Sequence, residues 1–231
     1  MKLIALCSWY DERPEHLRQL VRSLAPVVDL ALFLDGPYEL YGEPGTPLRS
    51  PAEQAKAIRD EAQTCGLRLV LVVDATPRDG WPRPGEVGKR RELWRRGLEL
   101  ARPGDWLFWV DADEVVERAE TEQLRRLLAR TERDVAEVTM AQRLDVESSW
   151  PMRRLFRALP DLTCDAAHWH VVADARVLQG NSDLHALEPA EDATALLTIR
   201  HRREERCSER NAAQRRFYEL RDATGDEKLT A

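Results

Sequence analysis

Two carboxylates follow an apolar segment in the stretch from Trp106 to Glu114, which reads WLFWVDADE. Asp111 and Asp113 are separated by one residue, and in an extended backbone such residues point to the same side. Hard oxygen ligands on one side suit Mg²⁺ or Mn²⁺ that holds a diphosphate. The alternative interpretation is an acidic turn before a helix, where carboxylates interact favourably with the helix N-terminus.

The same motif permits other enzymatic interpretations. A strand that ends in Asp-Ala-Asp-Glu-Val resembles the nucleophile motif of haloacid-dehalogenase-type phosphatases, but three strand–helix units precede it here, whereas that motif normally lies on the first strand. A strand that ends in acids also resembles a Walker B motif. The segment from Gly85 to Arg90 lacks both the spacing and the Ser or Thr of a P-loop, so we exclude a P-loop site.

Basic residues cluster on the helix predicted just upstream of this motif. Lys89 and Arg90 lie near the N-terminal end of that helix, where free backbone N–H groups already favour anions. We therefore expect Lys89 and Arg90 to face a diphosphate. Arg95 and Arg96 are expected on a solvated face, with pairs such as Glu92–Arg95 one turn apart.

Histidines provide the remaining candidate ligands. His168 and His170 are predicted on one side of a strand, and His201 follows the apolar run Ala195–Arg200. A lone histidine is more often structural than a ligand. A histidine late in the chain can nevertheless complete the coordination of a metal that an early aspartate holds.

The elements that must position these residues alternate between strand and helix in the first half of the chain. Apolar segments predict strands at 3–7, 30–34, 67–73 and 106–110, with helices between them. Strands that are apolar on both faces indicate a parallel sheet covered on both sides. Ligands bind at the carboxyl ends of such strands. An acid follows each predicted strand: Asp11, Asp35, Asp74 and Asp111.

The second half of the chain has a different pattern. After a helix at about 119–130, shorter strand-like pieces occur at 136–141, 153–157, 170–172 and 195–199, and a polar helix is predicted at about 204–222. No internal repeat or linker separates the halves. One domain with two lobes is therefore expected.

Composition narrows the class of protein. The 231 residues include 35 Lys and Arg against 41 Asp and Glu, a formal net charge of −6, which argues against a general nucleic-acid coat protein. No apolar run approaches the roughly 20 residues that span a bilayer. The four cysteines are scattered without a CxxC pair, so neither a disulfide framework nor a cysteine zinc site is expected, and a reducing cytoplasm is the default location.

The ordered set of motifs resembles a known family. Cys7-Ser8-Trp9-Tyr10-Asp11-Glu12, then Leu32–Gly36, Glu86-x-x-Lys89-Arg90 and Asp105–Glu114 look like the landmarks of GT-A-fold glycosyltransferases, in particular the family 2-like group. The resemblance covers residues 1–115 and is weaker at Arg154–Arg157, Ala167-His168 and Thr198–His201. It implies an α/β fold with a Rossmann-like, mostly parallel central sheet, helices on both faces and a smaller mixed C-terminal lobe.

The resemblance also implies the organisation and the ligands. Residues 1–231 would form a single GT-A domain, with a nucleotide-sugar-binding half (1–115), an acceptor-side half (116–203) and a C-terminal helix and tail (204–231). The donor would be a nucleotide sugar and the cofactor Mn²⁺ or Mg²⁺. The acceptor is open: a glycan, a small molecule or a modified DNA base. Transfer with inversion is inferred from the family alone.

Roles for single residues follow from the same resemblance. The metal would be held by Asp111, Asp113 and His201. The general base is open among Glu147, Asp165 and His168. The donor would be bound by Cys7, Trp9, Tyr10, Asp11, Asp35, Asp74, Lys89, Arg90 and Asp111.

Two alternatives of other classes remain. One is a phosphatase or nucleotidyltransferase that uses Asp111 and Asp113. The other is a non-catalytic module that binds a sugar nucleotide or a nucleic acid. Release of phosphate from simple phosphomonoesters would favour the first, and donor binding without turnover would favour the second.

Overall fold

A computed structural model describes residues 1–36, 47, 49–73, 86–141, 149–164, 170–180 and 186–202. The first half contains β1 (Leu3–Trp9), α1 (Pro14–Leu24), β2 (Leu30–Asp35), α2 (Ala52–Cys65), β3 (Leu69–Val73), α3 (Glu86–Leu100) and β4 (Trp106–Asp111). The second half contains β5 (Glu114–Ala119), α4 (Thr121–Arg130), β6 (Val135–Ala141), β7 (Ser149–Arg157), β8 (Thr163–Cys164), β9 (Val171–Ala173), β10 (Arg176–Gln179), β11 (Glu191–Asp192) and β12 (Leu197–His201).

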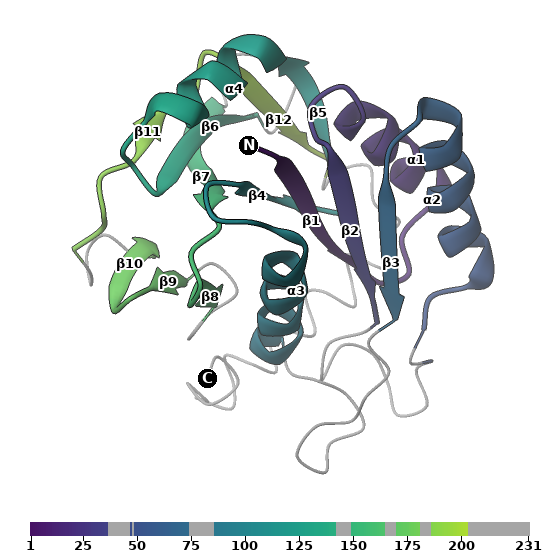
Figure 1. The fold of residues 1–231 in the computed structure, drawn as a ribbon. Helices are drawn as coiled ribbons and strands as arrows, with labels where there is room; N and C mark the ends of the chain where they lie inside the picture. Colours follow the sequence, from purple (N-terminus) through teal and green to yellow (C-terminus); the bar gives the residue numbers. More distant parts are fainter. Residues whose placement is uncertain are drawn as a thin grey trace.

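The central sheet is mixed but mostly parallel. Its strand order is β3-β2-β1-β4-β7-β6-β12-β5, and β11 pairs with β6 (Figure 1). The first four strands of this order run parallel, because β1 pairs in parallel with both β2 and β4, and β2 with β3. Antiparallel β7 then joins β4 to β6. The parallel half is the one that the apolar segments predict.

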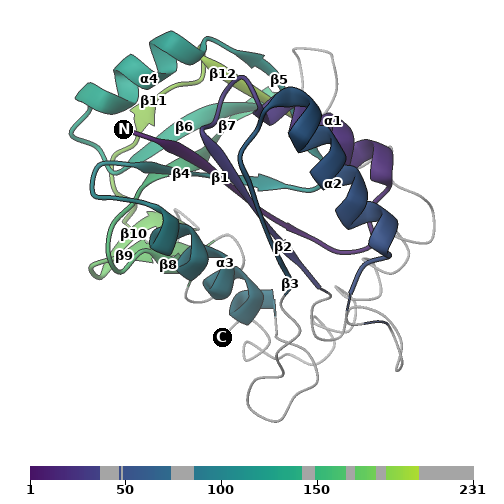
Figure 2. The ribbon, with the colours of Figure 1, turned by 45° about the vertical axis from the view of Figure 1, so that its right-hand side comes forward.

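Helices cover both faces of this sheet (Figures 1 and 2). On one face, α1, α2 and α4 contribute Leu17, Ile58 and Leu124 to a buried cluster with the strands. On the other face, Leu93 and Trp94 of α3 pack in a second cluster. The small antiparallel sheet β10-β9-β8 joins this second cluster. A mixed α/β fold with helices on both faces is therefore present, as the sequence pattern predicts.

Helix α3 lies very close to the sheet at Gly97. A Cβ atom added to this glycine would lie 2.8 Å from Cδ2 of Leu6, which is fully buried on β1. The glycine therefore permits the close approach of α3 to β1. This approach places the first turns of α3, which carry Lys89 and Arg90, next to the carboxyl ends of the strands.

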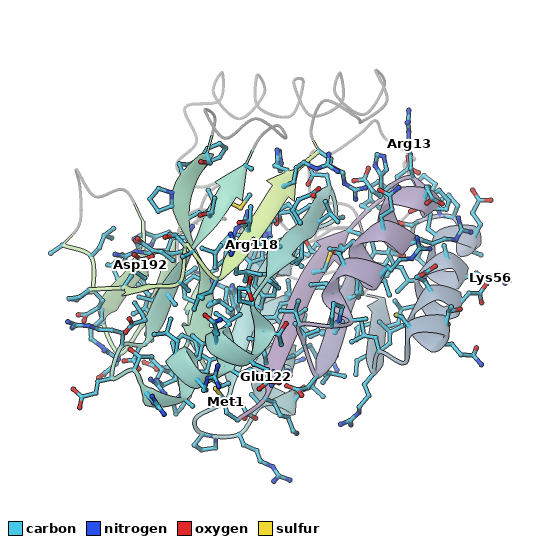
Figure 3. All side chains as sticks on the ribbon, turned by 90° about the horizontal axis from the view of Figure 1, so that it is seen from above. Met1, Arg13, Lys56, Arg118, Glu122 and Asp192 are labelled. Carbon is cyan, nitrogen blue, oxygen red and sulfur yellow. The ribbon has the colours of Figure 1, made fainter. Side chains whose placement is uncertain are left out.

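Many charged side chains project outward from the surface. Figure 3 shows labelled examples, among them Arg13 and Lys56, extending away from the ribbons, and both residues are exposed. Each helix in the described part of the chain is too short or too polar to cross a lipid bilayer.

One expectation about the second half is wrong, and another is not tested by the described residues. The interpretation of the acidic motif as a turn that leads into a helix is wrong, because β5 begins at Glu114 and α4 only at Thr121. The apolar pattern does not predict β5, because three of its six residues are charged and only its first residue is buried, as an edge strand allows. The polar helix expected at 204–222 lies outside the described residues.

Candidate functional site

Asp111 is held between two arginines at the end of β4. Its Oδ1 accepts from Nη1 of Arg90 at 3.1 Å, and its Oδ2 lies 3.4 Å from Nη2 of Arg154. Both guanidinium groups also lie over the ring of Trp109, at 4.8 Å and 4.9 Å from its centroid. Arg90 comes from α3 and Arg154 from β7, so three elements converge on one carboxylate.

Glu114 is the most deeply buried acid of the motif. Its side chain is fully buried, accepts from the Nη2 of Arg154 and accepts the backbone N–H of Asp111 at 2.8 Å. The pKa of Glu114 is raised to about 7, chiefly by burial and also by the charges of Asp111 and Asp113, while the charge of Arg154 opposes the rise. Three acids and a guanidinium therefore form one electrostatic unit.

Asp113 meets His201, which the sequence places 88 positions later. The Nε2 of His201 lies 2.8 Å from Oδ2 of Asp113, and Asp113 is only 1% exposed. Burial alone would lower the pKa of His201, but the hydrogen bond and charge of Asp113, together with Glu114 and Asp111, raise it above its ordinary value. The contact exists because His201 ends β12, which pairs with β5 opposite Glu114.

Arg202, the residue after His201, is buried and links the end of β12 to Asp113. It is 1% exposed. Its backbone N–H donates to the carbonyl of Asp113 at 2.7 Å. Its guanidinium donates to the Oε1 of Gln19 and to the carbonyl of His16 at 3.0 Å, both on α1. The end of β12 is thus tied to the acidic motif and to the first helix at once.

The residues proposed to hold a metal have suitable chemistry but not the arrangement of a three-ligand protein site. Within the described ranges, no group of three His, Cys, Asp or Glu side chains is placed to hold an ion. Asp111 is engaged by guanidinium groups, whereas Asp113 and His201 lie together and offer an oxygen and a nitrogen. Mg²⁺ is commonly held by one or two carboxylates plus substrate phosphates. The Nε2 of His201 faces Oδ2 of Asp113 here, so binding of a metal by this pair stays a prediction.

Lys89 makes a different contact from the one that the sequence suggests. Its Nζ is buried and donates to the backbone carbonyl of Trp9 at 3.0 Å and to that of Gly36. It therefore ties α3 to the carboxyl ends of β1 and β2. Its predicted contact with a diphosphate stays a prediction.

The expected solvated pairs further along α3 are confirmed. Arg95 lies 2.6 Å from Oε1 of Glu92, and Nε of Arg96 lies 2.8 Å from the same oxygen. Arg95 and Arg96 contact Glu92 and not Asp111. Helix α3 therefore has a buried basic part near the acidic motif and an outer basic part that carries these two arginines.

The predicted nucleoside-side residues form a second polar network at the same edge. Asp35, buried at the end of β2, accepts the hydroxyl of Ser50 at 2.5 Å and its backbone N–H at 3.0 Å. The backbone N–H of Asp11 donates to the hydroxyl of Ser50, and Gln54 donates to Oδ1 of Asp11. Asp11 has a φ of 47°, a left-handed conformation that sharply redirects the chain after β1.

The remaining residues of the N-terminal motif differ in accessibility. Cys7 is fully buried, and burial raises the pKa of its thiol well above the usual value, so the thiol is unreactive. Trp9 is buried and packs edge-on against Phe33. Tyr10 donates its hydroxyl to the carbonyl of Pro47.

Four predicted site residues lie outside the described part of the chain: Asp74, Glu147, Asp165 and His168. Three important residues received no site role from the sequence. Glu114, Arg154 and Arg202 are buried charges whose partners come from elements distant in the chain. For Glu114 and Arg154 the available signal was their place in the segments Asp105–Glu114 and Arg154–Arg157 of the resemblance, and that signal does not name a partner.

Comparisons with known proteins leave the family open. No family model matches the chain, and no curated protein matches it. Among solved structures, TarS from S. aureus is 13% identical with a TM-score of 0.38, covering 62% of this chain and 22% of TarS. A structure of TarS 1–349 is 16% identical with a TM-score of 0.43, covering 68% of this chain and 47% of that one. Mannose-6-phosphate isomerase from Helicobacter pylori is 10% identical with a TM-score of 0.38, covering 63% and 52%.

This chain thus spans less than half the length of either TarS structure. At these TM-scores the likenesses establish neither a family nor an activity.

Proposed function

We propose that this protein is a glycosyltransferase that moves a sugar from a nucleotide-sugar donor to an acceptor hydroxyl. The observation that carries the proposal is the contact between Asp113 and His201, 2.8 Å apart at the edge where the parallel strands end. The sequence resemblance pairs this acid and this late histidine as partners at a donor diphosphate.

The proposed chemistry rests on charge. When the bond between the sugar and the diphosphate breaks, negative charge builds on the leaving group, and preorganised cationic groups lower the barrier. Mn²⁺ or Mg²⁺, held by Asp113 and His201, would supply positive charge at that position. The acceptor hydroxyl needs a base, for which Glu147, Asp165 and His168 are the candidates.

Ion pairing of Asp111 weighs against the phosphatase alternative. A carboxylate that attacks phosphorus must present a free oxygen lone pair. Each oxygen of Asp111 faces a guanidinium, from Arg90 and from Arg154. These pairs lower the nucleophilicity of the carboxylate, so Asp111 is better suited to hold and orient than to form a covalent intermediate.

A thermal-shift screen tests the proposal. The purified chain is heated with UDP-, GDP-, CMP- and TDP-sugars, each with and without Mn²⁺. A ligand at a hundredfold its Kd stabilises the folded state by about 2.7 kcal/mol, which raises the Tm by several degrees. We expect one base to stand out, and its sugar to be released or transferred.

Two outcomes overturn the proposal. One is the absence of a shift with every donor. The other is hydrolysis of simple phosphomonoesters at a rate that Asp111→Asn abolishes. Donor binding without hydrolysis or transfer to any acceptor would instead identify a binding module.

A further inference from the structure

Arg154 occupies a central place that the proposed chemistry does not use. It lies on β7, in the second half of the chain, and is 4% exposed. Its Nη2 donates to Glu114 and lies 3.4 Å from Asp111. Its guanidinium also lies 4.9 Å from the centroid of Trp109. One side chain therefore contacts two acids of the motif and the aromatic ring beneath them.

These contacts fix the direction of the carboxylates. Glu114 accepts from Arg154 with one oxygen and from the N–H of Asp111 with the other. Asp111 in turn is held on its second oxygen by Arg90. Both contacts come from Nη2 of a planar guanidinium that also lies over Trp109, and the compact ammonium group of lysine does not reproduce this planar stacking. The loss of Arg154 leaves both carboxylates less constrained.

We propose that Arg154 is a positioning residue for donor binding: it holds Asp111, directly and through buried Glu114, in the orientation that receives the nucleotide sugar, and so couples β7 to the donor site. This inference rests on the proposed glycosyl transfer. It assigns Arg154 no contact with the donor itself.

The same strand offers a matched control. Arg157 lies three residues further along β7 and makes contacts of the same kind at the opposite end of β4. Its guanidinium lies 4.9 Å from the centroid of Trp106, and its Nε lies 2.9 Å from Asp134. Replacing Arg157 by Met removes an ion pair and a cation–π contact without touching the acidic motif.

The experiment compares the wild type with Arg154→Met, Arg154→Lys and Arg157→Met. The probe is the sugar nucleotide that gives the largest shift in the screen of UDP-, GDP-, CMP- and TDP-sugars. Donor Kd by calorimetry, donor KM and kcat, and Tm are measured for each. Loss of a supporting residue behind a ligand typically costs 10- to 100-fold in affinity or activity.

We expect Arg154→Met to raise the donor Kd and KM at least about tenfold. Arg154→Lys should recover part of the affinity, because it keeps the charge but not the planar stacking. Arg157→Met should lower Tm and leave Kd and KM within about twofold, since affinity responds only near the ligand. If Arg154→Met does not fold, a Kd of Arg154→Lys equal to that of the wild type refutes the inference.

The two proposals fail in different ways. A wild type that binds none of the four donors overturns the glycosyltransferase proposal, and the positioning role with it. A wild type that binds a donor, together with an Arg154→Met variant whose Kd and KM match those of Arg157→Met, overturns only the positioning role. In that case Arg154 merely stabilises the fold.

Discussion

Replacement of Asp113 by Asn separates catalysis from stability more cleanly than any other single change at this site. Asn has nearly the same volume, so no cavity forms. The change removes a charge-assisted hydrogen bond to His201, which contributes about 1.5–3 kcal/mol. It also removes one negative charge beside buried Glu114, whose pKa Asp113 helps to raise. These effects oppose each other, so the free energy of unfolding should change by less than about 2 kcal/mol.

Activity should respond very differently. Asp113 is proposed to hold the cation at the leaving diphosphate, and loss of one such electrostatic group costs about 10²–10³ in rate. Asn still offers an oxygen but no charge. We therefore expect transfer, measured as nucleotide release per folded molecule, to fall at least a hundredfold, while urea unfolding stays close to that of the wild type.

Asp105 provides the matched control at the other end of β4. It is also buried, and its carboxylate accepts the backbone N–H of Lys2 at 2.6 Å and that of Arg102 at 2.9 Å. Asp105→Asn should cost stability of about 1.5–3 kcal/mol and leave activity per folded molecule unchanged. If Asp113→Asn keeps its specific activity within about threefold, or only its stability falls as in Asp105→Asn, the proposed role of Asp113 is refuted.

Three further predictions concern packing, pH and metal. Gly97→Ala should lower the free energy of unfolding, measured in urea, by up to about 2 kcal/mol. The clash of the new Cβ with Leu6 costs about 1–3 kcal/mol, and the higher helix propensity of alanine returns only about 1 kcal/mol. A stabilised variant would contradict this. Burial would raise the pKa of Asp29, but hydrogen bonds from the N–H of Leu3 and from Arg125 lower it below 3.8. The ionised Asp29 therefore stabilises the folded state fully above that pH, and this stabilisation is lost as the pH falls through the folded pKa. Asp29→Asn should flatten this acid limb, and an unchanged limb would refute the assignment. Excess EDTA should abolish transfer and Mn²⁺ restore it; full activity in EDTA would exclude the proposed metal.

The parallel half of the fold is largely readable from the sequence because its strands are buried on both faces. Residues in β1 and β2 are buried without exception, so each strand is a continuous apolar run that ends where polar residues begin. The edge strand β5 lacks such a run, since three of its six residues are charged. Its position is set by pairing with β12, 80 residues later in the chain, and no local pattern contains that information.

The sequence predicted which residues gather at this edge better than it predicted their contacts. The pairing of Asp113 with His201 follows the resemblance. The roles of Arg154 and Lys89 depend on which acceptor lies within reach once β7 and α3 have packed, and basic residues have many possible partners in a sequence with 41 acids. Lys89 finds two backbone carbonyls and Arg154 finds two acids, although both occur in sequence contexts typical of a basic surface.

Buried charge is concentrated at the carboxyl ends of the parallel strands. At the carboxyl ends of the parallel strands the protein buries several charged side chains near the ring of Trp109 and the turn after β4, among them Arg90, Asp113, Glu114 and Arg154. Burying charges costs several kcal/mol each before pairing, and well-packed apolar residues often stabilise a fold equally well. The same sheet shows that apolar packing is available to this chain, because Trp94 packs edge-on against Phe156 and Trp109 next to this cluster. A polar cluster kept beside such packing is therefore better explained by a charged ligand than by stability.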